Sequence, residues 1–321
     1  MIWLQLSKFD ENPFLNKFNF NVEKEFRIEI FNYSINFLAT APTVCVAKPE
    51  KIVFVLSPPN SEKTRREIRL TWLRDLKLSL NFEAFFLTGL WTNSSLEKLL
   101  NESNYYGDMV MADFHDTYKN LTLKTGLAFA WLSEFCKSAT LVMKADDDTV
   151  VLHQGLAPIL ANINCSNDAI YGSVNRTPQP IRQNISKWYI SEVDYPNTTF
   201  PDFVAGGSSY ILTGRSVQRL TEALLTYSGF YLFLEDVFFT GILAESLGIP
   251  RISDFSHKFI VGGTHPLIAC KKHLAGVHYV TNVTGYYANY SMCSERMQER
   301  KRFFPETIRR KKIRGKVRIL Q

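Results

Sequence analysis

The chain has 321 residues, of which 45% are hydrophobic and 21% charged, so it can bury a large core and is not a wholly disordered protein. Its net charge of +6 comes from the C-terminal end. Residues 294–321 hold eleven Lys or Arg and three Glu, a balance of +8, which leaves −2 for the rest (6 minus 8). A body without surplus positive charge argues against nucleic-acid binding. The basic tail itself favours a solvated terminus over a phosphate-binding or membrane-surface role.

Residues 1–48 show no clear periodicity and are interpreted as a stem-like lead-in. Their longest uncharged stretch, residues 30–47, lacks the sustained apolarity of a membrane span, so no membrane anchor is visible. Strands and helices then alternate. Strands are predicted at 51–57, 81–88, 108–113 and 140–144, and helices at 62–80, 95–103 and 120–138. This alternation predicts an α/β fold with a mainly parallel sheet flanked by helices. Residues 170–203, rich in Pro and Asn, predict long loops over a site.

Three consecutive carboxylates, Asp146, Asp147 and Asp148, follow the apolar strand at 140–144. They repel one another unless a cation neutralises them, and carboxylate oxygens suit Mg²⁺ or Mn²⁺ with a phosphate on the open side. In a mainly parallel sheet, ligands bind at this end of the strands. A solvated acidic turn is the alternative. A nucleotide-hydrolysing enzyme is not supported, because the sequence has no Gly-x-x-x-x-Gly-Lys-Ser/Thr loop.

Cysteines and glycosylation sequons both indicate an oxidising, lumenal compartment. The five cysteines form no Cys-x-x-Cys pair, which argues against zinc, and they could make two disulfides and leave one free thiol. Ten of the twenty asparagines begin an Asn-x-Ser/Thr sequon. These are Asn32, Asn93, Asn101, Asn120, Asn164, Asn175, Asn184, Asn197, Asn282 and Asn289.

Four further segments accompany the acidic triplet. Arg65 and Arg69 stand one helical turn apart in Arg-x-x-x-Arg-x-Thr-Trp. The segment 113–125 follows, reading Asp-Phe-His-Asp-Thr-Tyr-Lys-Asn-Leu-Thr-Leu-Lys-Thr. Next come a run of small residues with Gly206 and Gly207 at 205–209, and Glu-Asp-Val at 235–237. The arginine pair, the 113–125 segment, the acidic triplet and Glu-Asp-Val, in this order, resemble the β-1,3-galactosyltransferase family, which includes β-1,3-N-acetylglucosaminyltransferases. The run of small residues departs from the Gly-x-Gly pattern of many relatives. The resemblance covers residues 30–290.

The resemblance implies a Rossmann-like A-type glycosyltransferase fold over a catalytic domain at 49–290, followed by the basic tail at 291–321. It implies an inverting transfer from a UDP-sugar, with galactose favoured over an N-acetylhexosamine, to the 3-hydroxyl of a glycan on a glycoprotein or glycolipid. Mn²⁺ is the expected cofactor, with Mg²⁺ as an alternative. The family also implies membrane association in the Golgi lumen with type II topology, although no anchor is visible in this sequence.

Residue roles at the metal and the nucleotide follow from the same resemblance. Asp148 is expected to ligate the metal directly, while Asp146 and Asp147 lie nearer the ribose or act through water. His278 matches the late metal-binding histidine of the family, with His273 as a rival and a surface or core position as the alternative. Gly206 and Gly207 would let backbone approach the donor closely.

Asp236 matches the general base of the family. Its apolar neighbours should desolvate the carboxylate and raise its pKa. Glu235 and Asp236 could also act as a helix N-terminal pair, and the two roles can coexist.

Several basic residues have two readings. Arg65 and Arg69 could contact the nucleotide or serve the fold. Lys124 and Lys144 could neutralise the diphosphate or hold the acidic cluster together. Cys45 and Cys136 each precede a strand, so a bridge between them is expected if those strands are neighbours.

Two rival functions remain open at the level of sequence. A non-catalytic lumenal carbohydrate-binding relative would keep the fold without turnover, but the retained acidic residues argue against it because buried acidic clusters are costly. A metal-dependent phosphohydrolase would release phosphate without an acceptor.

Overall fold

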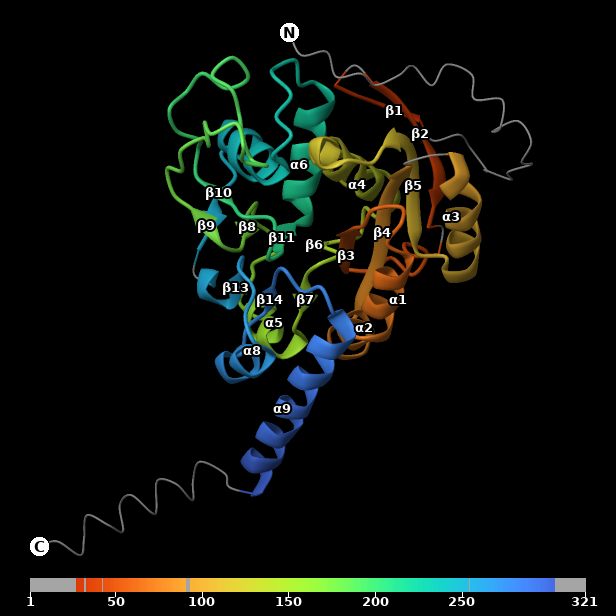
Figure 1. Ribbon diagram of the computed structural model, residues 1–321, viewed down its shortest axis with the longest axis vertical. Coiled ribbons are helices and arrows are strands. Elements are labelled where there is room, and N and C mark those ends of the chain that lie inside the picture. Colours follow the sequence, from red (N-terminus) through yellow and green to blue (C-terminus); the bar gives the residue numbers. More distant parts are fainter. Residues whose placement is uncertain (1–26, 32, 42, 91–92, 254, 304–321) are drawn as a thin grey trace, which may run out of the picture.

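Among the residues that the structure describes, nine strands form one mixed sheet in the order β1-β2-β5-β4-β3-β6-β11-β8-β12 (Figure 1). The structure is a computed structural model and describes residues 27–31, 33–41, 43–90, 93–253 and 255–303. Its strands are β1 (Arg27–Ile30), β2 (Tyr33–Thr40), β3 (Lys51–Leu56), β4 (Phe82–Leu90), β5 (Met109–His115), β6 (Leu141–Asp146), β7 (Val150–Val151), β8 (Ile170–Tyr171), β9 (Val174–Asn175), β10 (Phe203–Val204), β11 (Tyr210–Thr213), β12 (Arg251–Ile252), β13 (Phe259–Ile260) and β14 (Gly276–Val277).

The helical segments alternate with the strands over the first half of the chain, as the sequence predicts for an α/β fold. They are α1 (Glu62–Leu70), α2 (Trp72–Leu80), α3 (Asn93–Tyr106), η2 (Tyr118–Asn120), α4 (Leu121–Phe135), α5 (His153–Leu160), α6 (Gly214–Leu225), the π-helix η3 (Val237–Leu243), α7 (Ala244–Ser246), η4 (Ser256–Lys258), α8 (Pro266–Lys272) and α9 (Val283–Phe303). The predicted strands at 51–57, 81–88, 108–113 and 140–144 are confirmed as β3 to β6.

The centre of the sheet is parallel and its flanks are mixed. Strands β5, β4, β3 and β6 pair in parallel, while β11 runs antiparallel to β6 and β2 runs antiparallel to β5. The α/β architecture expected for the A-type fold is therefore confirmed, with parallel pairing confined mostly to the four central strands. The register of β3 and β6 brings Leu56 opposite Asp146, so both strands end at the same edge.

The sheet begins earlier in the chain than the expected lead-in at 1–48 allows. Strands β1 and β2 add a hairpin to the sheet edge, and Ile35 and Phe37 of β2 are buried there. The alternation of these two apolar residues with polar neighbours is the period-2 pattern of a half-buried strand. The first 26 residues lie outside the described residues.

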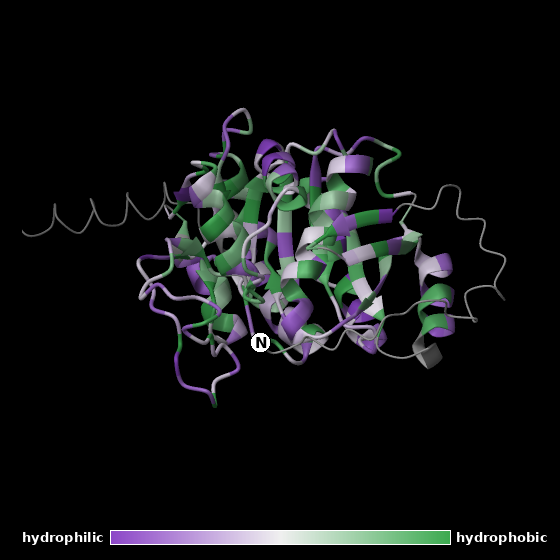
Figure 2. Cartoon of the chain, turned by 90° about the horizontal axis from the view of Figure 1, so that it is seen from above, coloured by the Kyte–Doolittle hydropathy of each residue, from purple (hydrophilic) through white to green (hydrophobic). Residues whose placement is uncertain are grey.

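Two layers of helices cover the sheet. Alternate side chains of β3 enter the two cores: Phe54 packs with α4, α6 and η3, while Val53 and Val55 pack with α1, α2, α3 and α5. Figure 2 shows hydrophobic residues gathered on the central strands and the inward parts of these helices. The helix predicted at 62–80 is broken at Thr71, whose φ of −116° and ψ of −113° are not helical. The break turns Arg65 and Ile68 of α1, and Trp72 of α2, into the interior.

A small three-stranded sheet, β13-β14-β7, extends the fold beyond the acidic triplet. Val277 of β14 pairs with Val150 of β7, and the Val280 amide donates to the Asp148 carbonyl at 2.8 Å. These backbone bonds bring the segment that carries His278 beside the triplet.

Two disulfides are present, as the sequence suggested. The expected bridge joins Cys45 and Cys136, because β3 and β6 are neighbours. The second joins Cys270 of α8 to Cys293 of α9, and Cys165 is a free cysteine.

Helix α9 extends away from the body of the molecule (Figure 1). It crosses the expected boundary of the basic tail at residue 291, and the tail beyond residue 303 lies outside the described residues. None of the helices described in this structure is both long and apolar enough to span a membrane.

Candidate active site

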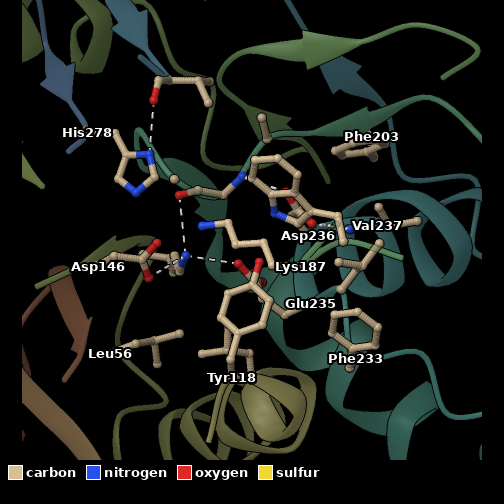
Figure 3. Close-up of a pocket in the computed structure, with 18 of the residues that line it drawn as sticks. Leu56, Tyr118, Asp146, Lys187, Phe203, Phe233, Glu235, Asp236, Val237 and His278 are labelled. Atoms are coloured by element: carbon tan, nitrogen blue, oxygen red, sulfur yellow. Dashed lines mark hydrogen bonds and ion pairs between the residues drawn. The ribbon is translucent and has the colours of Figure 1, made fainter. Parts of the chain in front are cut away.

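A cavity of 630 Å³ lies at the carboxyl ends of β3 and β6. The acidic triplet, the glycine pair, the Glu-Asp-Val segment and the segment of His278 all line it, together with part of the 170–203 loop. In the view of Figure 3, His278 and Asp146 lie on one side and Glu235 and Asp236 on the other. The fold thus brings together sequence segments that are more than one hundred residues apart. The prediction that this loop covers the site is confirmed.

Asp146, Asp148 and His278 form a compact cluster. One ligand atom from each lies within 4.8 Å of the others, and His278 Nε2 is 3.1 Å from Asp148 Oδ1. His278 Nδ1 is 3.0 Å from the Val261 carbonyl, which can only accept, so Nδ1 carries the proton. That leaves Nε2 toward the cluster when the imidazole is neutral. Two carboxylate oxygens and one imidazole nitrogen are a donor set that fits a divalent cation.

His278 titrates higher than an ordinary histidine in the absence of a cation. Burial alone would lower its pKa, but the hydrogen bond and the charge of Asp148 more than offset this and raise it. The rival His273 caps the end of α8 and does not belong to the cluster.

Asp146 and Asp147 have different surroundings, although the sequence treats them alike. Asp146 belongs to the cluster with Asp148 and His278, and its expected place nearer the ribose or behind water stays a prediction. Asp147 accepts a hydrogen bond from Ser57 Oγ at 3.1 Å, and its burial raises its pKa. The two side chains diverge because they follow one another at the end of β6.

Lys144 links the cluster to the opposite side of the cavity. Its Nζ lies 2.7 Å from Asp146 and 2.9 Å from Glu235, and it donates to the Gly206 carbonyl at 3.3 Å. Burial alone would lower the pKa of Lys144, but the two carboxylates raise it. Lys144 is therefore a fixed positive charge that holds the acidic residues together, which confirms the structural reading of this residue.

Glu235 and Asp236 are neighbours with different access to the cavity. Glu235 is buried, with one oxygen on Lys144 and the other accepting from Tyr210 Oη at 3.0 Å. Burial raises its pKa to about 7, although the charge of Lys144 opposes the rise. Both carboxylate oxygens of Glu235 are therefore engaged by side chains of the protein.

Asp236 is partly exposed and lines the cavity. Its oxygens accept from the Gly206 amide at 3.0 Å and from the Val237 amide at 2.9 Å. The second bond makes Asp236 the N-cap of η3, so the helix-terminal role expected for it is present. Burial raises the pKa of Asp236 above the ordinary aspartate value, against the lowering effect of the Gly206 amide. A carboxylate that is accessible, oriented and more basic than usual is suited to act as a general base.

Gly206 and Gly207 leave room for functional side chains. A Cβ on Gly206 would lie 3.1 Å from Lys144 Nζ, and one on Gly207 would lie 2.5 Å from His278 Cε1. The Gly207 carbonyl also accepts from Thr149 Oγ1 at 2.7 Å. Both glycines line the cavity.

Arg65 and Arg69 do not line this cavity, and their expected nucleotide contact stays a prediction. Arg65 is fully buried and pairs with Glu102 at 2.6 Å, and Arg69 pairs with Glu102 and Asp108 at 2.8 Å each. Their guanidinium groups form ion pairs with carboxylates of the fold, as the structural alternative expects. Arg65 reaches the site only indirectly, by donating to Ser57 Oγ at 3.1 Å.

Lys124 lines the cavity but is paired. It lies 2.7 Å from Asp116 and donates to the Ser57 carbonyl at 2.9 Å. Both acceptors are protein groups, so Lys124 anchors α4 to the end of β3.

Several lining residues escaped the sequence reasoning. Tyr118, Lys187 and Trp188 line the cavity, and the ring of Tyr279 stacks on His278 with centroids 3.9 Å apart. The adjacent Lys187 and Trp188 in this loop are the one signal that could have marked this segment.

Comparisons with known proteins agree with the segments named above. A family model described as galactosyltransferase matches residues 63–254. Beta-1,3-galactosyltransferase 5 of Homo sapiens is 29% identical over 282 residues, covering 86% of this chain and 86% of that protein. Lactosylceramide 1,3-N-acetyl-beta-D-glucosaminyltransferase B of Danio rerio is 32% identical over 266 residues, covering 79% of this chain and 67% of the relative. The solved structure of galactosyltransferase LgtC with donor and acceptor sugar analogues aligns over 75% of this chain and 95% of its own, with 9% identity and a TM-score of 0.40.

Proposed function

The chain belongs to the galactosyltransferase family and is a glycosyltransferase, and from this premise we propose an inverting β-1,3-glycosyltransferase. The donor is a UDP-sugar, galactose being favoured over an N-acetylhexosamine. The acceptor is the 3-hydroxyl of a glycan on a glycoprotein or glycolipid. The two relatives named above are a galactosyltransferase and an N-acetylglucosaminyltransferase, and both names specify β-1,3 transfer or a 1,3 linkage.

One observation carries the proposal: a cluster suited to a divalent cation and a separate basic carboxylate line the same cavity. Asp146, Asp148 and His278 would hold Mn²⁺, with Mg²⁺ as the alternative. When bound, the cation neutralises the charge that develops on the leaving diphosphate.

The residues of the chain supply the remaining steps. Asp236 takes the proton of the acceptor hydroxyl, because it is the accessible carboxylate of the Glu-Asp-Val segment. Lys144 keeps Asp146 and Glu235 in place without being consumed by the reaction. Inversion requires the base to act on the face opposite the leaving group, and Asp236 lies across the cavity from His278 (Figure 3).

We place the protein in the lumen of the Golgi apparatus. Two disulfides suit an oxidising compartment, and most of the sequon asparagines in the described residues are exposed.

The test is release of UDP from a panel of UDP-sugars, with Mn²⁺, with Mg²⁺ and with a chelator, across galactosyl, glucosaminyl and galactosaminyl acceptors. We expect turnover of one donor that requires both a divalent cation and an acceptor. UDP binding without turnover over a broad glycan library would instead favour a non-catalytic carbohydrate-binding relative. Metal-dependent release of phosphate without an acceptor would favour a phosphohydrolase.

A further inference from the structure

Lys187, carried by the loop over the cavity, differs from the other two lysines that line it. Lys144 and Lys124 are each held by carboxylates of the protein. Lys187 makes no ion pair with any carboxylate that the structure describes. A lysine whose charge is not used by the protein is available to an anionic ligand.

Three aromatic rings surround the Lys187 ammonium group. Its Nζ lies 4.7 Å from the ring centroid of Trp188, 5.4 Å from that of Tyr118 and 5.7 Å from that of Tyr279. Ring faces attract a cation without neutralising its charge. The aromatic cage thus orients Lys187 while it leaves the full positive charge for a ligand.

The cage spans the two functional sides of the cavity. On one side, Tyr279 stacks on His278, a member of the cation cluster. On the other, Tyr118 lines the same cavity as Asp236, and burial together with the charge of Asp236 raises the pKa of Tyr118 to about 12. Figure 3 shows Lys187 between His278 and Asp236, with its amine end on the side of His278 and Asp146.

The negative charge of the cavity explains why a further positive side chain is needed to bind an anionic ligand. Six carboxylates line it, and two of its three lysines are already paired. A nucleoside diphosphate would meet net negative charge here. A metal ion bound by Asp146, Asp148 and His278 would offset this negative charge from one side only.

We propose that Lys187 binds the terminal phosphate of the nucleoside diphosphate, beside the cation cluster, and stabilises it as the leaving group. This inference rests on the proposed function. In the transfer, the acceptor oxygen forms a bond to the anomeric carbon while the bond from that carbon to the diphosphate oxygen breaks. Its electron pair leaves with the diphosphate, and the acceptor proton goes to Asp236. Lys187 keeps its proton and contributes charge alone.

The experiment compares UDP with UMP, which lacks the terminal phosphate. Calorimetry with excess Mn²⁺ would give the affinities of the wild type and of Lys187→Ala, Lys187→Arg and Lys119→Ala. Lys119 is the matched control, because its Nζ lies 3.4 Å from the ring centroid of Phe233 while the residue does not line the cavity.

We expect Lys187→Ala to weaken UDP binding about tenfold or more and to leave UMP binding within about twofold of wild type. Lys187→Arg should restore most of the UDP affinity, and Lys119→Ala should bind both nucleotides as the wild type does. Repeating the UDP titration with a chelator should show the same loss in Lys187→Ala relative to the wild type, because the lysine acts independently of the cation.

Three results would overturn the inference in distinguishable ways. Equal losses of affinity for UDP and for UMP would mean that Lys187 supports only the conformation of the loop. Unchanged UDP affinity in Lys187→Ala, with normal binding by the wild type, would reject Lys187 alone. Absence of cation-dependent UDP binding by the wild type would reject the proposed function, and this inference with it.

Discussion

The imidazole of His278 occupies the space that a side chain on Gly207 would fill. A Cβ built on Gly207 would lie 2.5 Å from His278 Cε1, closer than side chains approach one another. The ring is also held from behind by the Val261 carbonyl, 3.0 Å from Nδ1, so it cannot simply retreat. Glycine is required at position 207 by the position of the histidine.

The Gly207→Ala variant should therefore lose cation affinity without unfolding. The added methyl would push the imidazole out of the cluster, and displacing one of three ligands should weaken Mn²⁺-dependent UDP binding about tenfold or more. Gly262→Ala is the matched control, since a Cβ on Gly262 meets nothing within 4 Å. Calorimetric titration with Mn²⁺ and UDP would measure this. Wild-type affinity in Gly207→Ala would remove His278 from the cation site.

Replacing Asp148 should weaken cation binding without destabilising the fold. Asp148 is 41% exposed, so Asp148→Ala leaves no buried group unpaired except for the lost contact with His278. We expect weaker Mn²⁺-dependent UDP binding, by about tenfold or more, and an unchanged melting temperature without metal. If the variant binds UDP and Mn²⁺ as tightly as the wild type, Asp148 is not a ligand.

Asp236→Asn should abolish transfer and keep the donor site. The amide cannot accept the acceptor proton, so kcat should fall by about 10² to 10⁴ while UDP affinity stays near the wild-type value. Steady-state rates and UDP titrations on the same preparations would show this. Equal loss of turnover and UDP affinity would contradict the assignment of the base.

The same carboxylate should govern the acid side of the pH profile. The base works when deprotonated, and burial raises the pKa of Asp236. The rate should therefore fall as pH drops through a value above that of an exposed aspartate, which titrates at about 3.9. The profile of kcat against pH would measure this. An acid limb at the ordinary aspartate pKa would mean that the cavity does not desolvate Asp236.

Glu102 should be important for stability rather than chemistry. It pairs with buried Arg65 at 2.6 Å and with Arg69 at 2.8 Å. Glu102→Gln removes the negative charge between two buried cations and should lower the free energy of unfolding by about 3–5 kcal/mol. Glu83→Gln is the control, because the pair of Glu83 with Lys77 is about 40% exposed on both sides and should change stability by less than about 1 kcal/mol. Urea unfolding of both variants would decide; similar losses would contradict the buried-network reading.

Asn120 should remain without a glycan although it begins a sequon. Only 5% of the residue is exposed, and its Nδ2 donates to the His115 carbonyl at 2.7 Å, so the nitrogen that would carry the sugar is already engaged. Asn184 and Asn197 on the exposed loop are the comparison. Glycopeptide mass spectrometry of protein secreted from eukaryotic cells would test this. Occupancy at Asn120 would show that sugar transfer precedes folding of this segment.

The sequence predicted the elements whose apolar runs are long and buried on both faces, such as β3 and β6. It missed the β1–β2 hairpin, because only Ile35 and Phe37 of β2 are fully buried and the polar residues Ser34 and Asn36 interrupt its apolar run. It also missed the break at Thr71, since neither Gly nor Pro marks the point where two buried faces require the chain to turn.

The sequence predicted residues of the candidate site, but not the partners that surround them. Asp148, His278 and Asp236 were proposed from the resemblance to the family, and the structure gathers them in one cavity. The partners of Arg65 and Arg69 were not predictable, because Glu102 and Asp108 lie more than thirty residues away in the chain with no periodic relation to them. The surroundings of Lys187 were not predictable for the same reason, because two of its three rings, Tyr118 and Tyr279, come from distant segments of the chain.

The cation cluster also has a thermodynamic meaning for the whole chain. Asp148 and His278 are 130 residues apart in sequence (278 minus 148), so their common ligand exists as a site only in the folded chain. Any ion that binds this site stabilises the fold by mass action, by about 2.7 kcal/mol when its free concentration is a hundred times its dissociation constant. The lifetime of this protein in the cell should therefore depend on the free metal concentration of its compartment, even when no sugar is being transferred.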